Sequence, residues 1–103
     1  MENEKTFSKF FKAFGDPTRL KILTLLASSK EMTVNEIVEK IKLSQPTISR
    51  HLAILREADA VTDRREGQNV YYSLNKTAVS GCCTGFCDCL AIPVVVEKKS
   101  KKK

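Results

Sequence analysis

The amino-acid sequence predicts a mainly α-helical domain that carries one small β-hairpin. Apolar residues recur at helical spacing over residues 7–55. The pattern then changes to β-branched and aromatic runs, which occupy residues 61–65 and 69–74. A chain of 103 residues is near the lower size limit for a self-sufficient core, so we expect a single domain that forms a homodimer.

The first two segments of the chain are expected to form helices. The first carries phenylalanines on one face, at Phe7, Phe10, Phe11 and Phe14. The second begins cleanly, with Asp16 as its N-cap and Pro17 at its first helical position. The apolar residues behind this start predict a deeply buried helix, and they are Leu20, Ile22, Leu23, Leu25 and Leu26.

Two short helices joined by a tight turn are predicted next. The first, at residues 33–41, opens with a capping box, in which the side chains of Thr33 and Glu36 bond to each other's backbone N–H groups. The second begins after Ser44, another N-cap residue. Its apolar residues stand at helical spacing, at Ile48, Leu52 and Leu55. Since only residues 42 and 43 separate the two helices, they must meet at a tight turn.

The segment after these helices predicts a β-hairpin. The runs "VTDRR" and "NVYYSL" are separated by "EGQ", in which Gly67 supplies the permissive turn conformation. The order of helix, helix, helix-turn-helix and hairpin is that of a winged helix-turn-helix domain. We expect this DNA-binding and dimerisation domain to occupy residues 1–92, and the lysine-rich residues 93–103 to form a flexible tail.

Composition narrows the classes of function. The chain has 18 lysine and arginine residues against 12 acidic residues, and its net charge of +6 favours a polyanionic partner. It has neither an apolar run of the roughly 20 residues needed to span a membrane nor a secretory signal, so we expect a cytoplasmic protein with reduced thiols and no membrane partner. No acid/base pair or nucleophile and base set is recognisable, which argues against an enzyme.

Polar and basic side chains stand where a winged helix-turn-helix would meet double-stranded operator DNA. In this fold the N-terminal part of the second short helix enters the major groove, where amides, hydroxyls and guanidinium groups read base edges. The residues of this kind on the expected exposed face are Gln45, Thr47, Ser49 and Arg50. On the hairpin, Arg64, Arg65 and Gln68 are expected to contact the backbone or the minor groove. We assign His51, the sole histidine, to helix-edge packing or a phosphate contact rather than to metal binding.

Three stretches of the sequence resemble a known family. "FGDPTRLKILTLL", "LSQPTISRHLAILREADAV" and "RREGQNVYYSL" are similar to the ArsR/SmtB family of bacterial and archaeal metal-responsive repressors, over about residues 7–75. The resemblance implies a homodimeric winged-helix repressor that leaves its operator DNA when an inducer binds. Asp59 departs from the family, which usually has glycine there, but aspartate tolerates the left-handed backbone conformation better than most residues.

The resemblance does not identify the inducer, because members of the family place their ligands at different sites. Arsenic-responsive members often carry cysteines at the entry to the helix-turn-helix, where this chain has "TVNEI" at residues 33–37. Members that sense zinc, nickel or cobalt use carboxylates and histidines on the last helix, and no histidine follows Leu74. What remains is the stretch "GCCTGFCDC", where the last helix would begin or run. It holds all four cysteines of the chain, Cys82, Cys83, Cys87 and Cys89.

The cysteine cluster predicts a site for a soft metal or metalloid, because thiolates are soft ligands. A structural zinc site usually takes two cysteine pairs separated by a longer loop, and this cluster is more compact. Trivalent arsenic or antimony needs only three thiolates on one side of the atom. We therefore expect one such ion per protomer as the inducer, with the segment bending at Gly81 or Gly85. The ligands would be Cys82, Cys83 and one of Cys87 or Cys89.

Other functions of the cluster stay open. Thiolates also bind Zn(II), Cd(II) and Cu(I), so a repressor of the same fold that responds to one of these ions is an alternative. Clustered cysteines oxidise readily, so a disulfide could drive the same release from DNA. The chain could also be a constitutive DNA-binding module with a structural metal site. Release of an operator by an inducer distinguishes a repressor from such a module, and metal stoichiometry under reducing conditions distinguishes coordination from oxidation.

Overall fold

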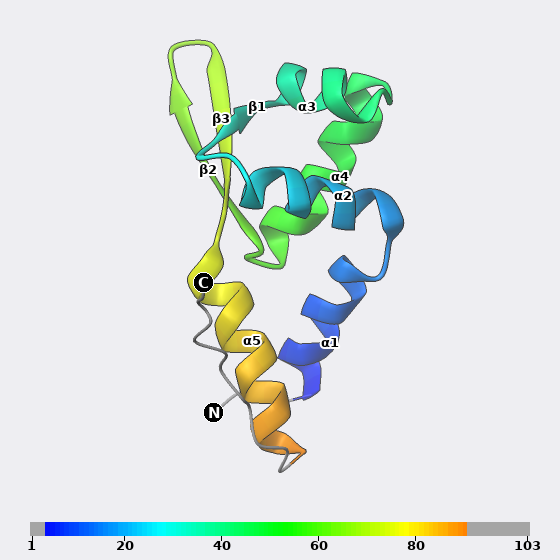
Figure 1. Cartoon of the computed structure of the whole chain (residues 1–103), viewed down its shortest axis with the longest axis vertical. Helices are drawn as coiled ribbons and strands as arrows, with labels where there is room; N and C mark the ends of the chain where they lie inside the picture. The colour runs from blue at the N-terminus through cyan, green and yellow to red at the C-terminus, as the bar shows by residue number, and fades with distance from the viewer. Residues whose placement is uncertain (1–3, 91–103) are drawn as a thin grey trace, which may run out of the picture.

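The structure is a computed structural model, and it describes residues 4–90 apart from the side chain of Cys89 (Figure 1). The expected tail at residues 93–103 lies outside the described residues. The helices are α1 (Glu4–Phe14), α2 (Pro17–Ala27), α3 (Val34–Ile41), α4 (Gln45–Glu57) and α5 (Lys76–Cys89). The strands are β1 (Met32–Thr33), β2 (Val61–Glu66) and β3 (Asn69–Leu74). The mainly helical class and the order of its elements are confirmed.

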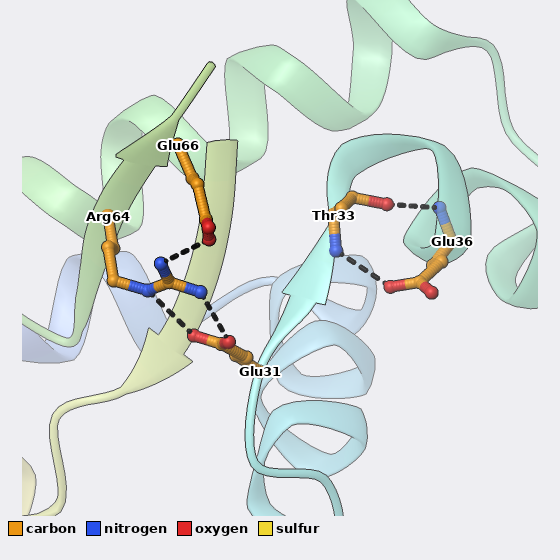
Figure 2. Close-up of polar contacts among 5 residues, drawn as sticks. All are labelled: Glu31, Thr33, Glu36, Arg64 and Glu66. Carbon is orange, nitrogen blue, oxygen red and sulfur yellow. Dashed lines mark hydrogen bonds and ion pairs between the residues drawn. The ribbon is translucent and has the colours of Figure 1, made fainter. Parts of the chain in front are cut away.

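The helices begin where their capping residues stand. The Asp16 carboxylate and the Ser44 hydroxyl each accept a hydrogen bond from the backbone N–H three residues later, at 3.0 and 3.4 Å. The predicted capping box is complete: the Glu36 N–H donates to Thr33 Oγ1 at 3.2 Å, and the Thr33 N–H donates to Glu36 Oε1 at 2.9 Å (Figure 2). These bonds satisfy N–H groups that have no partner inside the helix.

Backbone conformations with positive φ occur at breaks between the elements. Gly67 has φ 63° at the tip of the hairpin, and Asp59 has φ 65° between α4 and β2. Both conformations were predicted from the sequence and are confirmed. Lys42 has φ 69° as the C-cap of α3, and this left-handed residue lets the chain turn directly into α4.

One buried cluster joins the helices to the base of the hairpin. Its fully buried large side chains are Ile22, Leu26, Ile37, Ile48, Leu52, Leu55 and Val61. The expectation that α2 is deeply buried is only partly right, because Ile22 and Leu26 lie in the cluster whereas Leu20 is 48% exposed. Residues two positions apart on a helix lie on different faces, so α2 buries one stripe rather than its whole surface.

The two ends of the molecule are built from different elements (Figure 1). At one end α1 and α5 lie side by side, and the ring of Phe86 packs edge-on against Phe7 and Phe11, with centroid separations of 5.5 and 4.8 Å. At the other end the β2–β3 hairpin projects from the domain. The sequence did not predict β1, which pairs antiparallel with β3 and makes a sheet of strand order β1-β3-β2. The hairpin is therefore supported by a third strand that leads into α3.

Replacing Asp59 with glycine should raise the free energy of unfolding by up to about 1 kcal/mol, because glycine adopts a left-handed conformation without steric cost. Asp59→Ala should lower it, since alanine lacks both the freedom of glycine and the local hydrogen bonding of aspartate. Urea unfolding at a fixed protomer concentration measures both changes. A glycine variant less stable than the wild type would contradict the backbone explanation.

Candidate DNA interface and cysteine helix

Helix α4 presents a polar face because its opposite face is fixed in the core. The buried face consists of Ile48, Leu52 and Leu55. The exposed face contains an amide, a hydroxyl and a guanidinium, on Gln45, Ser49 and Arg50. Thr47 is half-buried, and its hydroxyl lies 2.9 Å from the hydroxyl of Ser44 at the helix cap. Three of the four side chains expected to read bases therefore point outward together, and the fourth helps to close the cap.

His51 contacts α2. Its Nδ1 atom lies 3.2 Å from Arg19 Nη1 and 3.9 Å from Asp16 Oδ2, and its side chain is 17% exposed. The Nε of Arg19 also donates to the carbonyl oxygen of Ala13 at 2.8 Å. The backbone N–H of Arg19, followed by the charge of its side chain, holds the pKa of Asp16 below its usual value. Of the two roles expected for His51, these contacts favour packing at the edge of α4.

A cleft of about 160 Å³ lies between the tip of the hairpin and the starts of α3 and α4. Its lining residues are Thr33, Val34, Asn35, Gln45, Gln68, Asn69 and Val70. The structure thus brings Gln45 and Gln68, both expected to meet DNA, to one cleft. Sequence reasoning missed Asn35 and Asn69, which also line this cleft and whose carboxamides are able to donate and to accept hydrogen bonds. No local pattern marks them, because only the tertiary fold brings the hairpin tip close to α3.

The two arginines of the hairpin differ in their surroundings. Arg64 pairs with a carboxylate oxygen of Glu31 and one of Glu66, both at 2.7 Å, and its guanidinium carbon lies 4.7 Å from the centroid of the Tyr71 ring. Hydrogen bonds to Glu31 and Glu66 raise the pKa of Arg64, and the bond from Arg64 lowers the pKa of Glu31. Arg65 is exposed. The two carboxylates beside Arg64 offset its positive charge, which makes Arg65 the more favourable arginine for a phosphate contact.

Helix α5 runs unbroken from Lys76 to Cys89 through Gly81 and Gly85, so the bend expected when an ion binds stays a prediction. A glycine costs a helix only about 1 kcal/mol, and burial of a large apolar side chain contributes more. On this helix Cys82 is buried, and Ala78, Val79 and Phe86 pack partly buried against the core. The free energy gained by this packing therefore exceeds the helix-propensity cost of the two glycines.

The unbroken helix separates the cysteines that were expected to converge. Cys82 is 5% exposed and belongs to the core, whereas Cys83 is exposed and Cys87 is half-buried. Successive residues on a helix diverge by about 100°, so Cys83 and Cys87, four residues apart, share a face that Cys82 does not. Among the side chains described by the structure, no three cysteine, histidine or carboxylate groups are placed to hold a metal ion. The described cysteines therefore form a pair and one buried thiol.

Comparison with known proteins identifies the family. The family model described as "Bacterial regulatory protein, arsR family" matches residues 16–63. The transcriptional repressor SdpR of Bacillus subtilis is 51% identical over 69 residues, which are 67% of this chain and 76% of SdpR. The chain belongs to the ArsR family. The arsenic resistance transcriptional regulator ArsR1 of Pseudomonas putida is also 51% identical, over 63% of this chain but only 51% of ArsR1.

Solved structures of ArsR-type regulators share the fold. The structure of HlyU from Vibrio cholerae superposes with a TM-score of 0.69 at 34% identity, and the match covers 85% of this chain and 96% of HlyU. The winged helix-turn-helix is therefore confirmed, and the chain is a transcriptional regulator of the ArsR family rather than an enzyme. Within residues 4–90, no helix is both long and apolar enough to cross a bilayer.

Substitutions on α4 and on the hairpin should affect DNA binding differently. Gln45→Ala should change the preferred bases at a cost of about 1–3 kcal/mol, because an amide that contacts a base edge carries sequence information. Arg65→Ala should weaken binding to all sequences and reduce the slope of log K against log salt by about 0.9, the value of one phosphate contact. Fluorescence anisotropy with selected and scrambled duplexes over a salt series measures both effects. Unchanged affinity and salt slope in both variants would contradict this docking of the ArsR-family fold.

Proposed function

We propose that this chain is a homodimeric metalloregulatory repressor that leaves its operator when cysteine thiolates of α5 coordinate trivalent arsenic or antimony. The observation that carries the proposal is the position of Cys83 and Cys87. They share one face of α5, the helix that packs against α1 at the end of the molecule away from the hairpin (Figure 1). Soft thiolates favour soft or borderline ions over magnesium or calcium. A thiolate pair on this helix can link ligand binding to a movement of the helix.

Three thiolates are needed, and the intact helix supplies two. The third ligand is Cys82, or else Cys89, whose side chain lies outside the described residues. To bring Cys82 to the face of Cys83, the helix must unwind locally near its two glycines, where unwinding is least costly. In the reaction, three S–H groups displace three hydroxyls of arsenous acid, so three As–S bonds replace three As–O bonds and three water molecules leave. Neither arsenic nor sulfur changes its oxidation state.

Unwinding of α5 would alter the dimer. Phe11 is 38% exposed and Leu90 is 51% exposed, so the end formed by α1 and α5 carries apolar surface that a second copy of the chain would cover. A shift of this end changes the distance between the two reading helices, which must match successive major grooves of a pseudo-palindromic operator. A coupling free energy of about 1–3 kcal/mol would change operator affinity by about 5–150-fold.

Several relatives carry names consistent with a thiophilic inducer. They are named for arsenic resistance in Pseudomonas putida and Escherichia coli and for mercury resistance in Streptomyces lividans. Zn(II), Cd(II) and Cu(I) remain alternative inducers, because the same thiolates accept them. A thiol-redox switch is a second candidate, and the exposure of Cys83 one turn from Cys87 favours it. A test under reducing conditions separates coordination from oxidation.

The double variant Cys83→Ser and Cys87→Ser should remain folded, bind operator DNA with wild-type affinity and no longer dissociate when arsenite is added. Its reading helix is untouched, but serine hydroxyls are poor ligands for soft ions. The assay is fluorescence anisotropy of the protein–DNA complex, titrated with arsenite in a reducing buffer that contains no thiol. Thr84→Ala, an exposed substitution on the same helix, is the matched control and should respond like the wild type.

Two results would contradict the assignment. Release of the double variant by arsenite at the wild-type concentration would show that these thiolates are not the sensor. Loss of folding or of DNA binding in the double variant, measured without arsenite, would show that the cysteines are structural.

A further inference from the structure

Arg64 contacts two carboxylates and the ring of Tyr71, and its side chain is 51% exposed. Its Nη2 and Nε donate to the two carboxylate oxygens of Glu31 at 2.7 and 3.4 Å, and its Nη1 donates to Glu66 at 2.7 Å (Figure 2). The group also stacks over Tyr71, 4.7 Å from the ring centroid. The three nitrogens thus each meet a carboxylate oxygen. We call this set of contacts the cross-sheet bridge.

The cross-sheet bridge spans all three strands. Arg64 on β2 pairs across the ladder with Tyr71 on β3, and Tyr71 pairs with Thr33 on β1. Glu31 stands immediately before β1, so the arginine side chain extends over β3 to reach the far edge of the sheet. Thr33 is also the N-cap of α3 (Figure 2). The bridge therefore connects the hairpin to the segment that starts the helix-turn-helix.

The angle between the hairpin and the helices sets the width of the cleft of about 160 Å³ that lies between them. That cleft has Gln68 and Asn69 on the hairpin side and Asn35 and Gln45 on the helix side. A two-stranded hairpin is marginal on its own, and β1 contributes only a two-residue strand. A bidentate arginine–carboxylate contact adds a fixed geometry that the short strand lacks.

We propose that Arg64 is a positioning residue, whose bridge to Glu31 and Glu66 holds the hairpin at the angle that DNA binding requires. Adjacent residues of a strand point to opposite faces, so Arg65 lies on the face opposite to Arg64. Arg65 pairs with Val70, which lines the cleft. In this proposal Arg65 is therefore the arginine that contacts phosphate. The inference rests on the hairpin being part of the DNA-binding surface.

Glu31→Gln distinguishes two explanations of the Arg64 contacts, because they predict opposite changes in DNA affinity. The substitution keeps the shape of the side chain but removes a negative charge. If the bridge only holds Arg64 away from phosphate, this change should tighten DNA binding. If the bridge positions the hairpin, the change should weaken binding by about three- to fivefold, since the bidentate ion pair is lost although the protein has become more positive.

The experiment compares five full-length variants. They are Glu31→Gln, Arg64→Gln, the double variant that combines these two, Arg65→Gln and Glu57→Gln. The probe is a duplex selected by the wild-type protein from a random pool, and anisotropy is measured over a salt series. We expect Glu31→Gln and Arg64→Gln to weaken binding without a change in salt slope, and the double variant to be no weaker than Arg64→Gln alone. Arg65→Gln should reduce the slope by about 0.9. Glu57→Gln, an exposed charge removal at the end of α4, should not weaken binding.

Amide hydrogen exchange on the same proteins reports the hairpin directly. Exchange in β2 and β3 should be faster in Glu31→Gln and Arg64→Gln than in wild type, and unchanged in Arg65→Gln. Tighter DNA binding by Glu31→Gln, or a reduced salt slope in Arg64→Gln, would overturn the positioning role. If Arg65→Gln leaves both affinity and slope unchanged, the hairpin does not meet phosphate through Arg65, and the premise fails separately from the bridge.

Discussion

The DNA-reading surface depends on the burial of one aliphatic stripe of α4. Ile48, Leu52 and Leu55 are fully buried against side chains from the other helices and from the base of the hairpin. Burial of each such side chain contributes about 1.5–3 kcal/mol, more than an exposed polar contact on the opposite face. Rotation of α4 about its axis would expose the stripe, so the core dictates that Gln45 and Arg50 face outward. The polar face can therefore vary for recognition without changing the fold.

The same buried cluster reaches the cysteine helix. Cys82 of α5 is part of the cluster that includes Leu52 of α4, and Phe86 packs against α1. Protein interiors are close-packed, so a displacement of one member requires its neighbours to move. Coordination that unwinds α5 would thus disturb both the core and the proposed dimer contact. The shared core, reached through α1 and α2, would couple the proposed sensor to the DNA surface.

The sequence predicted features that depend on neighbours close in the chain. The N-caps at Asp16 and Ser44 follow from a few adjacent residues, and both are confirmed. The left-handed conformation of Asp59, which the family resemblance implied, is also confirmed. The unbroken path of α5 was not predicted, because the helix propensity of glycine says nothing of the packing of Phe86 on α1. Local sequence therefore predicted the backbone conformation correctly only where no distant contact favoured another conformation.

In the candidate site, too, features set by neighbouring residues were predicted and features set by distant contacts were not. The exposed face of α4 was predicted, because it is the complement of an apolar stripe. The ion pair between Arg64 and Glu31 was not predicted, because the two residues are 33 positions apart in the chain. They meet only when β1 joins the sheet. The cleft that joins Asn35 to the hairpin tip escaped prediction for the same reason. Long-range ion pairs and clefts are properties of the assembled fold.

Native mass spectrometry of the wild-type protein on its selected duplex, titrated with arsenite under reducing conditions, would show whether arsenic binding releases the DNA. It reports protomer number, bound arsenic, protons lost and bound DNA on the same particle. We expect a dimer on DNA that loses the duplex as each protomer gains one arsenic atom with loss of three protons. A dimer that carries arsenic on both protomers and still holds the duplex at unchanged affinity would contradict it.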